Sequence, residues 1–151
     1  MDIEEIVDHV TRLGGVLVQR PQLGDGTPDV SWGDVFFFYA PDGRVPRGRP
    51  FATIVTKPYP DEEPDPVLAQ DGSFRLNVDV GRASVAAVVG GATPAIGPDV
   101  WVPHPVYGAL GWVAVVDPGE RTAQRARELL GAAHAAARAR WERRTDVARG
   151  R

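Results

Sequence analysis

Two hydrophobic runs decide the fold: Asp34-Val35-Phe36-Phe37-Phe38-Tyr39 and Pro50-Phe51-Ala52-Thr53-Ile54-Val55-Thr56-Lys57. Both are rich in aromatic and β-branched residues, which favour β-strands. The first run is apolar on both faces, which indicates a central position in a sheet. Because Pro41-Asp42-Gly43 predicts a turn between the runs, we expect an antiparallel hairpin with a long connection.

Strict alternation of apolar and polar residues predicts a third long strand, from Phe74 to Val80. Successive side chains of a strand point to opposite faces of the sheet. The apolar set, Phe74, Leu76, Val78 and Val80, is therefore expected to face the core. Arg75, Asn77 and Asp79 are expected to face away from it, on an exposed face of the sheet.

Shorter elements flank these strands. A capping box formed by Asp2 and Glu5 predicts a helix that runs to Leu13. The other predicted elements are a strand at 16–19, a short helix at 83–89, a strand at 112–116 and a long helix starting at Asp117-Pro118. Strands joined by hairpins are antiparallel, so the sequence predicts an α+β fold. It has a single mostly antiparallel sheet, with the N-terminal and long C-terminal helices packed on one face. We expect one domain, 1–144, and a frayed tail, 145–151.

The segment 58–72 combines four prolines with five acidic residues. A connection of this length without secondary structure is unusual in a compact domain, and is either mobile or functional. Its acidic run, Asp61-Glu62-Glu63-Pro64-Asp65, can bind a cation, but we interpret it as a solvated charge run. The segment is therefore predicted to be the least ordered internal part of the chain.

Charge is spread unevenly along the 151 residues, whose net charge is −3. Residues 121–151 hold nine basic and three acidic residues, and every basic residue among them is arginine. This pattern is compatible with nucleic-acid binding, but we favour a solvated helix face. Because the rest of the chain is strongly acidic, we expect no specific binding to duplex DNA.

Composition also bears on the cellular setting. The chain has no cysteine, which is typical of reducing compartments, and its acidic first residues do not resemble a signal peptide. Its apolar runs are too short to cross a bilayer. We therefore expect a cytoplasmic protein without membrane association, either a monomer or a homodimer.

A search for catalytic motifs assigns no catalytic residue, metal site or cofactor. None of the three serines lies in a G-x-S-x-G elbow, and Lys57 does not follow a glycine-rich loop. Gly24-Asp25-Gly26 begins like a dinucleotide loop, but Asp29 stands at the third glycine's position. The three histidines show no metal-binding spacing.

Polar and aromatic residues nevertheless recur at the ends and on the outer face of the predicted strands. The candidate ligand-binding residues are Trp32, Asp34, Lys57, Arg75, Asn77, His104, Tyr107 and Trp112. Lys57, Arg75 and His104 offer positive charge, and the aromatic residues offer flat surfaces for a ring. A small anionic or aromatic ligand is therefore the expected partner, although each residue also fits an ordinary structural role.

Two hypotheses of different classes follow. In the first, the chain is a non-catalytic binding module that uses the exposed sheet face for a small ligand or a protein partner. In the second, it is a small cofactor-free enzyme with Asp34 or His104 as general acid or base. The absence of recognised nucleophiles, phosphate loops and metal motifs favours binding, and a nucleic-acid-binding protein is the weaker alternative.

The order of motifs resembles the MmcQ/YjbR-like domains and, more closely, an uncharacterised bacterial domain family related to them. The stretches that carry the resemblance, within roughly residues 1–140, are Ser31-Trp32-Gly33-Asp34, residues 50–57, Phe74-Arg75-Leu76-Asn77-Val78 and residues 104–112. The resemblance implies an α+β fold with an antiparallel sheet. DNA binding has been suggested for members of the family, but the resemblance supplies no established catalytic residues, and the acidic, lysine-poor composition of this chain departs from such a role.

Overall fold

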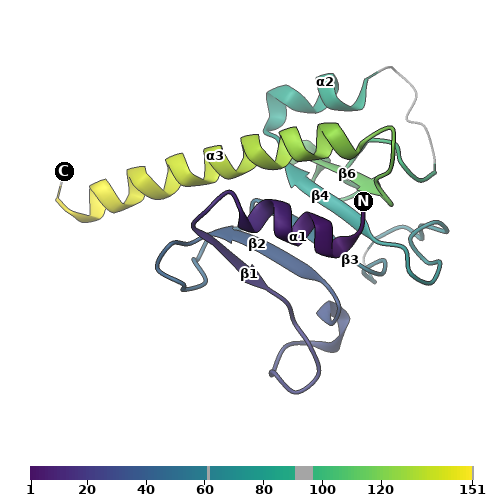
Figure 1. Ribbon diagram of the computed structural model, residues 1–151, viewed down its shortest axis with the longest axis horizontal. Helices are drawn as coiled ribbons and strands as arrows, with labels where there is room; N and C mark the ends of the chain where they lie inside the picture. The colour runs from purple at the N-terminus through teal and green to yellow at the C-terminus, as the bar shows by residue number, and fades with distance from the viewer. Residues whose placement is uncertain (61, 91–96, 151) are drawn as a thin grey trace.

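In the part of the chain that the structure describes, the fold is built on a six-stranded antiparallel sheet with strand order β1-β2-β3-β4-β6-β5 (Figure 1). The computed structural model describes residues 1–60, 62–90 and 97–150. The strands are β1 (Val16–Gln19), β2 (Val35–Tyr39), β3 (Ala52–Val55), β4 (Arg75–Asp79), β5 (Val102–Pro103) and β6 (Trp112–Val116). The helices are α1 (Ile3–Thr11), α2 (Val85–Val89) and α3 (Ala123–Ala148). The predicted α+β class and the hairpin of β2 and β3 are confirmed.

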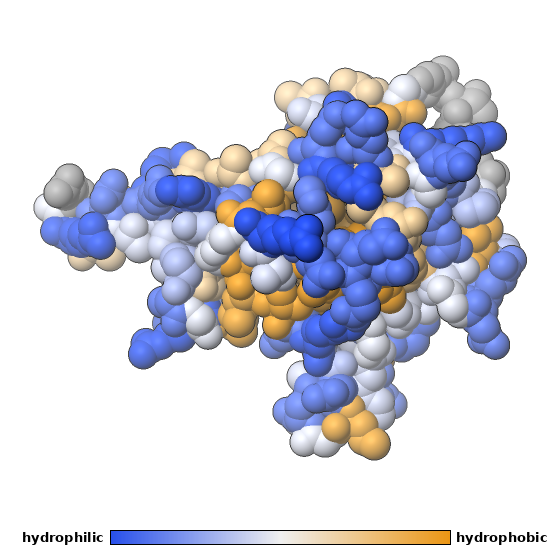
Figure 2. Space-filling view, viewed as in Figure 1, coloured by the Kyte–Doolittle hydropathy of each residue, from blue (hydrophilic) through white to orange (hydrophobic). Residues whose placement is uncertain are grey.

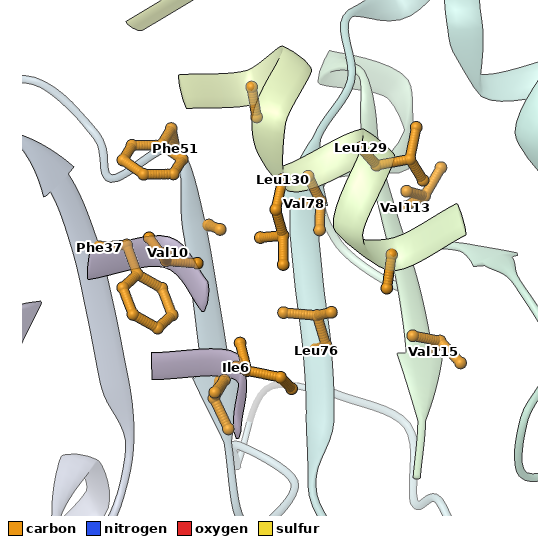
Figure 3. Packing of buried hydrophobic residues seen from close by; sticks show 14 of the residues in the cluster. Ile6, Val10, Phe37, Phe51, Leu76, Val78, Val113, Val115, Leu129 and Leu130 are labelled. Carbon is orange, nitrogen blue, oxygen red and sulfur yellow. The ribbon is translucent and has the colours of Figure 1, made fainter. Parts of the chain in front are cut away.

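One face of the sheet carries the main hydrophobic core. Ile6 and Val10 of α1 and Leu129 and Leu130 of α3 point toward apolar side chains of the strands (Figure 3). The strand residues of this core include Val35, Phe37, Ala52, Ile54, Leu76, Val78, Val113 and Val115. These core residues alternate along each strand with residues that are not part of this core. Because successive side chains of a strand point to opposite faces, the alternate residues form the second face of the sheet.

The C-terminal part of α3 extends well beyond the sheet (Figure 1). Its surface is mainly hydrophilic, whereas hydrophobic residues gather around α1 and the neighbouring strands (Figure 2). All arginines of α3 up to Arg144 are exposed, and two pair with glutamates of the same helix, Arg125 with Glu128 and Arg138 with Glu142. Among the described residues, no helix has the length and apolar character needed to cross a membrane.

The start of the last helix differs from the prediction. Asp117 has a left-handed backbone, with φ of 47°, and its carboxylate accepts hydrogen bonds from Ser73 Oγ and the Phe74 N–H. It therefore fixes a turn, and α3 begins only at Ala123. Strand β5 is not among the predicted elements, and it pairs with β6 at the edge of the sheet.

Asp99 supplies the acceptors at the start of α3. Its carboxylate accepts hydrogen bonds from the backbone N–H groups of Gly119, Arg121 and Thr122 and from Thr122 Oγ1, at 2.6–3.1 Å. Partial burial raises its pKa, but these hydrogen bonds outweigh that effect and lower the pKa overall. The carboxylate is thus a stabilising cap delivered from a distant loop.

We expect Asp99→Ala to lower the free energy of unfolding by about 1–2 kcal/mol, as measured by urea unfolding. Asp99→Asn should lose less, because asparagine keeps an acceptor oxygen and tolerates the left-handed backbone, φ 59°, at this position. Since the folded-state pKa is lowered, the stabilisation is complete above the unfolded pKa of about 4 and is lost as the pH falls below it. The exposed Asp71→Ala is the control, and an equal loss there would contradict this role.

Side chains from residues 62–72 pack against the second face of the sheet, and the expectation of a solvated charge run is wrong for Glu62. Leu68 is fully buried and packs with Val55 and Val116, residues of that second face. The Glu62 side chain is also mostly buried, in an ion pair with Arg75. The physical reason is that this pair compensates the acidic charge, so the segment can cover the sheet.

Candidate functional site

A pocket of about 240 Å³ lies on the second face of the sheet, opposite the main core. It is lined by Phe36, Arg49, Pro50, Thr53, Val55, Tyr59, Glu62, Arg75, Asn77, His104, Val106, Tyr107 and Trp112. Strands β2, β3, β4 and β6 supply its floor through side chains that alternate with the core residues. Its walls are supplied by residues outside these strands, namely Arg49 and Pro50, Tyr59 and Glu62, and His104, Val106 and Tyr107.

A hydrogen-bonded network of charged and polar side chains forms part of this floor. Arg75 donates from Nη1 and Nη2 to the two carboxylate oxygens of Glu62, at 2.9 and 3.0 Å. Arg75 Nε donates to Asn77 Oδ1 at 2.9 Å, and Asn77 Nδ2 donates to Thr53 Oγ1 at 2.9 Å. Only 3% of the Arg75 side chain and 8% of the Glu62 side chain are exposed. The bidentate pair therefore holds a guanidinium in a nearly water-free position.

His104 contributes a second buried polar group, and the structure defines which of its nitrogens carries the proton. Nδ1 lies 3.0 Å from the backbone N–H groups of both Val106 and Tyr107, so it must be the acceptor. Burial, followed by the nearby Arg75 charge, lowers the pKa of His104 to about 4. The ring is therefore neutral at pH 7, and its proton lies on Nε2.

Aromatic rings and a surface arginine complete the pocket. The His104 ring lies against Tyr107, with centroids 5.0 Å apart, and meets Trp112 edge-on at 6.4 Å. The Arg49 guanidinium lies over the Tyr107 ring, 5.3 Å from its centroid. Arg49 and Arg75 together bring two positive charges to the pocket lining, against the one negative charge of Glu62. The pocket thus combines flat apolar walls with a local positive charge.

The remaining candidate residues form a neighbouring cluster that does not line the pocket. Asp34 Oδ1 accepts hydrogen bonds from the N–H and Oγ1 of Thr56, and Oδ2 accepts one from Tyr59 Oη at 2.7 Å. Lys57 Nζ donates to the Trp32 carbonyl at 2.8 Å. Tyr59 is the only one of these residues that also lines the pocket, among those the structure describes. The Asp34 cluster therefore supports a pocket wall through Tyr59.

Burial dominates the electrostatics of this cluster. It raises the pKa of Asp34, although hydrogen bonds from Tyr59 and Thr56 and the charge of Lys57 oppose the effect. Burial also raises the pKa of Tyr59, and the hydrogen bond to Asp34 adds to that shift. Tyr59 therefore stays protonated and acts as the donor at neutral pH.

The structure brings together Arg75, Asn77, His104, Tyr107 and Trp112, and separates them from Trp32, Asp34 and Lys57. Arg75 and Asn77 are almost fully buried, so the prediction that they lie on an exposed face is wrong, because Glu62 and Leu68 lie against residues of that face. Sequence reasoning missed Arg49, Tyr59 and Glu62 as lining residues. No local signal marked Glu62, because alternation placed Arg75 on a face that we expected to be exposed, where a guanidinium needs no buried anionic partner.

No cluster of three or more histidine or acidic residues suited to a metal ion occurs among the described residues. Asp61 of the acidic run lies outside those residues, so the structure describes only part of that run.

Comparisons with known proteins place the chain in a family without assigning an activity. No curated protein and no solved structure matches it. The resemblance to MmcQ/YjbR-like domains is not confirmed and remains a hypothesis, while the expectation of an uncharacterised domain family is confirmed. Residues 1–146 match DUF6194, and the chain therefore belongs to this family of unknown function.

Proposed function

We propose that this chain is a non-catalytic binding domain that holds a small ligand in the pocket on the second face of its sheet. The observation that carries the proposal is the pairing of buried polar groups, Arg75 and His104, with aromatic walls in one cavity. Small-molecule sites typically combine mostly apolar walls with a few converging polar groups. A hollow of this kind suits a small ligand better than a protein partner, which needs a larger and flatter surface.

Acid–base catalysis has less support from the same contacts. Both carboxylate oxygens of Asp34 already accept hydrogen bonds, and Asp34 does not line the pocket. His104 Nδ1 accepts two backbone N–H groups, which leaves only its protonated nitrogen for a ligand. A general base needs a free lone pair within reach of the substrate proton.

A thermal-shift screen tests the proposal with benzoate, salicylate, nicotinate and indole-3-acetate as probes. A ligand that binds only the folded state raises the Tm, by about 3 °C or more at ten times its Kd for a domain of this size. We expect at least one probe to do so. Tyr107→Ala, which removes a wall of the pocket, should abolish the shift, whereas the nearby exposed Leu110→Ala should retain it.

Two results would contradict the proposal. One is a screen in which no probe raises the Tm of the unsubstituted chain. The other is a shift that survives unchanged in Tyr107→Ala, which would place the binding site outside this pocket.

A further inference from the structure

The pocket contains two hydrogen-bond donors that face each other. His104 Nε2 lies 3.5 Å from Arg75 Nη2. Nε2 carries the ring proton, since Nδ1 is engaged as an acceptor, and a guanidinium nitrogen has no acceptor lone pair. The two groups therefore do not satisfy each other, although both are buried.

Three of the five N–H hydrogens of Arg75 are committed. Nε donates to Asn77, and Nη1 and Nη2 each donate one hydrogen to Glu62. The second hydrogen of Nη2 remains on the side of His104. Within the part of the chain that the structure describes, His104 Nε2–H has no acceptor. A buried donor without an acceptor is costly, and such groups are frequent where a ligand binds.

From this geometry we infer that the pocket selects ligands that place an anionic oxygen, such as one oxygen of an aromatic carboxylate, against His104 Nε2–H and Arg75 Nη2–H. This inference rests on the proposed function and adds the chemical class of the ligand. One oxygen has two lone pairs, so it can accept from both donors at once. Arg49 adds a positive charge at the same pocket, and the Tyr107 and Trp112 rings offer surfaces for the ligand's ring.

The charge balance favours an anion over a cation or a neutral amine. Glu62 is compensated by the bidentate contact to Arg75, and Arg49 makes no ion pair among the described residues. An ammonium group placed beside His104 Nε2 and Arg75 Nη2 would meet two N–H donors there. Neutral acceptors such as amides should bind more weakly, because hydrogen bonds to charged groups are stronger.

The experiment is an NMR titration of the full chain with four probes that share one ring: benzoate, benzamide, toluene and benzylamine. The amide signals of Val106 and Tyr107 report on the pocket, because both N–H groups bind His104 Nδ1. We expect benzoate to bind about tenfold or more tightly than toluene, with benzamide between them and benzylamine weakest. Imidazole ¹⁵N shifts at pH 7 should show a protonated Nε2 and an unprotonated Nδ1.

Two variants separate the donors from the rest of the pocket. In His104→Asn, the amide oxygen Oδ1 takes the place of the acceptor Nδ1, because both atoms are bonded to Cγ. The variant has no atom in the place of Nε2, so that donor is removed. It should reduce the preference for benzoate over toluene to less than threefold, and a matching thermal melt checks that it folds. Arg49→Ala should weaken the binding of benzoate and leave the affinity for toluene unchanged. Arg47→Ala, at an exposed position, should change the affinity for neither probe.

The outcomes distinguish the inference from the proposed function. If toluene binds as tightly as benzoate, or if the proton of His104 lies on Nδ1, the inference fails while the pocket remains a binding site. If none of the four probes shifts the Val106 and Tyr107 signals, the proposed function fails as well. Should His104→Asn not fold, the order of the four probes on the unsubstituted chain still decides the inference.

Discussion

Glu62→Gln is expected to lower the free energy of unfolding by about 3–5 kcal/mol, because it leaves the buried Arg75 guanidinium without its counterion. The Arg75 side chain is 3% exposed and takes both carboxylate oxygens of Glu62. Glutamine can replace one of these acceptors but not the negative charge. Urea unfolding followed by circular dichroism measures the loss.

Glu63→Gln is the matched control, since Glu63 is the adjacent residue and is exposed. It should change stability by less than about 0.5 kcal/mol. The double variant Glu62→Leu with Arg75→Met should recover much of the loss, because replacing both partners leaves no unpaired buried charge. A loss below about 1 kcal/mol for Glu62→Gln would show that water reaches Arg75 and that segment 58–72 does not seal this face.

The fold was predictable where local patterns and tertiary packing agree. Alternation from Phe74 to Val80 and the apolar run at 35–39 predicted the right strands. In the first, the residues that face the main core recur with a period of two, and the second has the aromatic and β-branched composition that strands favour. The start of α3 was not predictable in the same way. Asp117 resembles a helix cap in the sequence, but its carboxylate is held by Ser73 and Phe74, which are distant in sequence. The helix is instead capped by Asp99, which is too distant in sequence to be recognised as a cap from the local pattern.

The candidate site was predictable only in part, for a related reason. Strand order brings Arg75, Asn77 and Trp112 onto one face, and the sequence pattern captured that arrangement. Glu62 was missed because an acidic, proline-rich run has the composition of a solvated loop. Its burial depends on one contact with Arg75 across thirteen residues of sequence. The composition of a segment indicates only how strongly it is solvated on average. The position of this loop depends on a single long-range ion pair, which composition does not indicate.

Trp112→Ala should cost about 3–5 kcal/mol of unfolding free energy, the range for a large aromatic residue removed from a packed position. Trp112 opens strand β6, which pairs with β4 and β5, is 5% exposed and meets the His104 ring edge-on. Its truncation therefore removes buried apolar area and leaves a cavity beside the pocket floor. Trp112→Phe should cost less, because a phenyl ring retains part of the contact with His104.

Leu110→Ala is the control, because Leu110 lies two residues away and is 39% exposed. Its loss should stay below about 1 kcal/mol. A similarly small loss for Trp112→Ala would mean that the tryptophan is not needed for folding. Trp112 would then be present chiefly for contact with a ligand, and the variant should lose benzoate binding while keeping its Tm. A large loss of stability would show that the fold needs Trp112, because strand alternation places its ring where the sheet and the His104 loop meet, at the lining of the pocket.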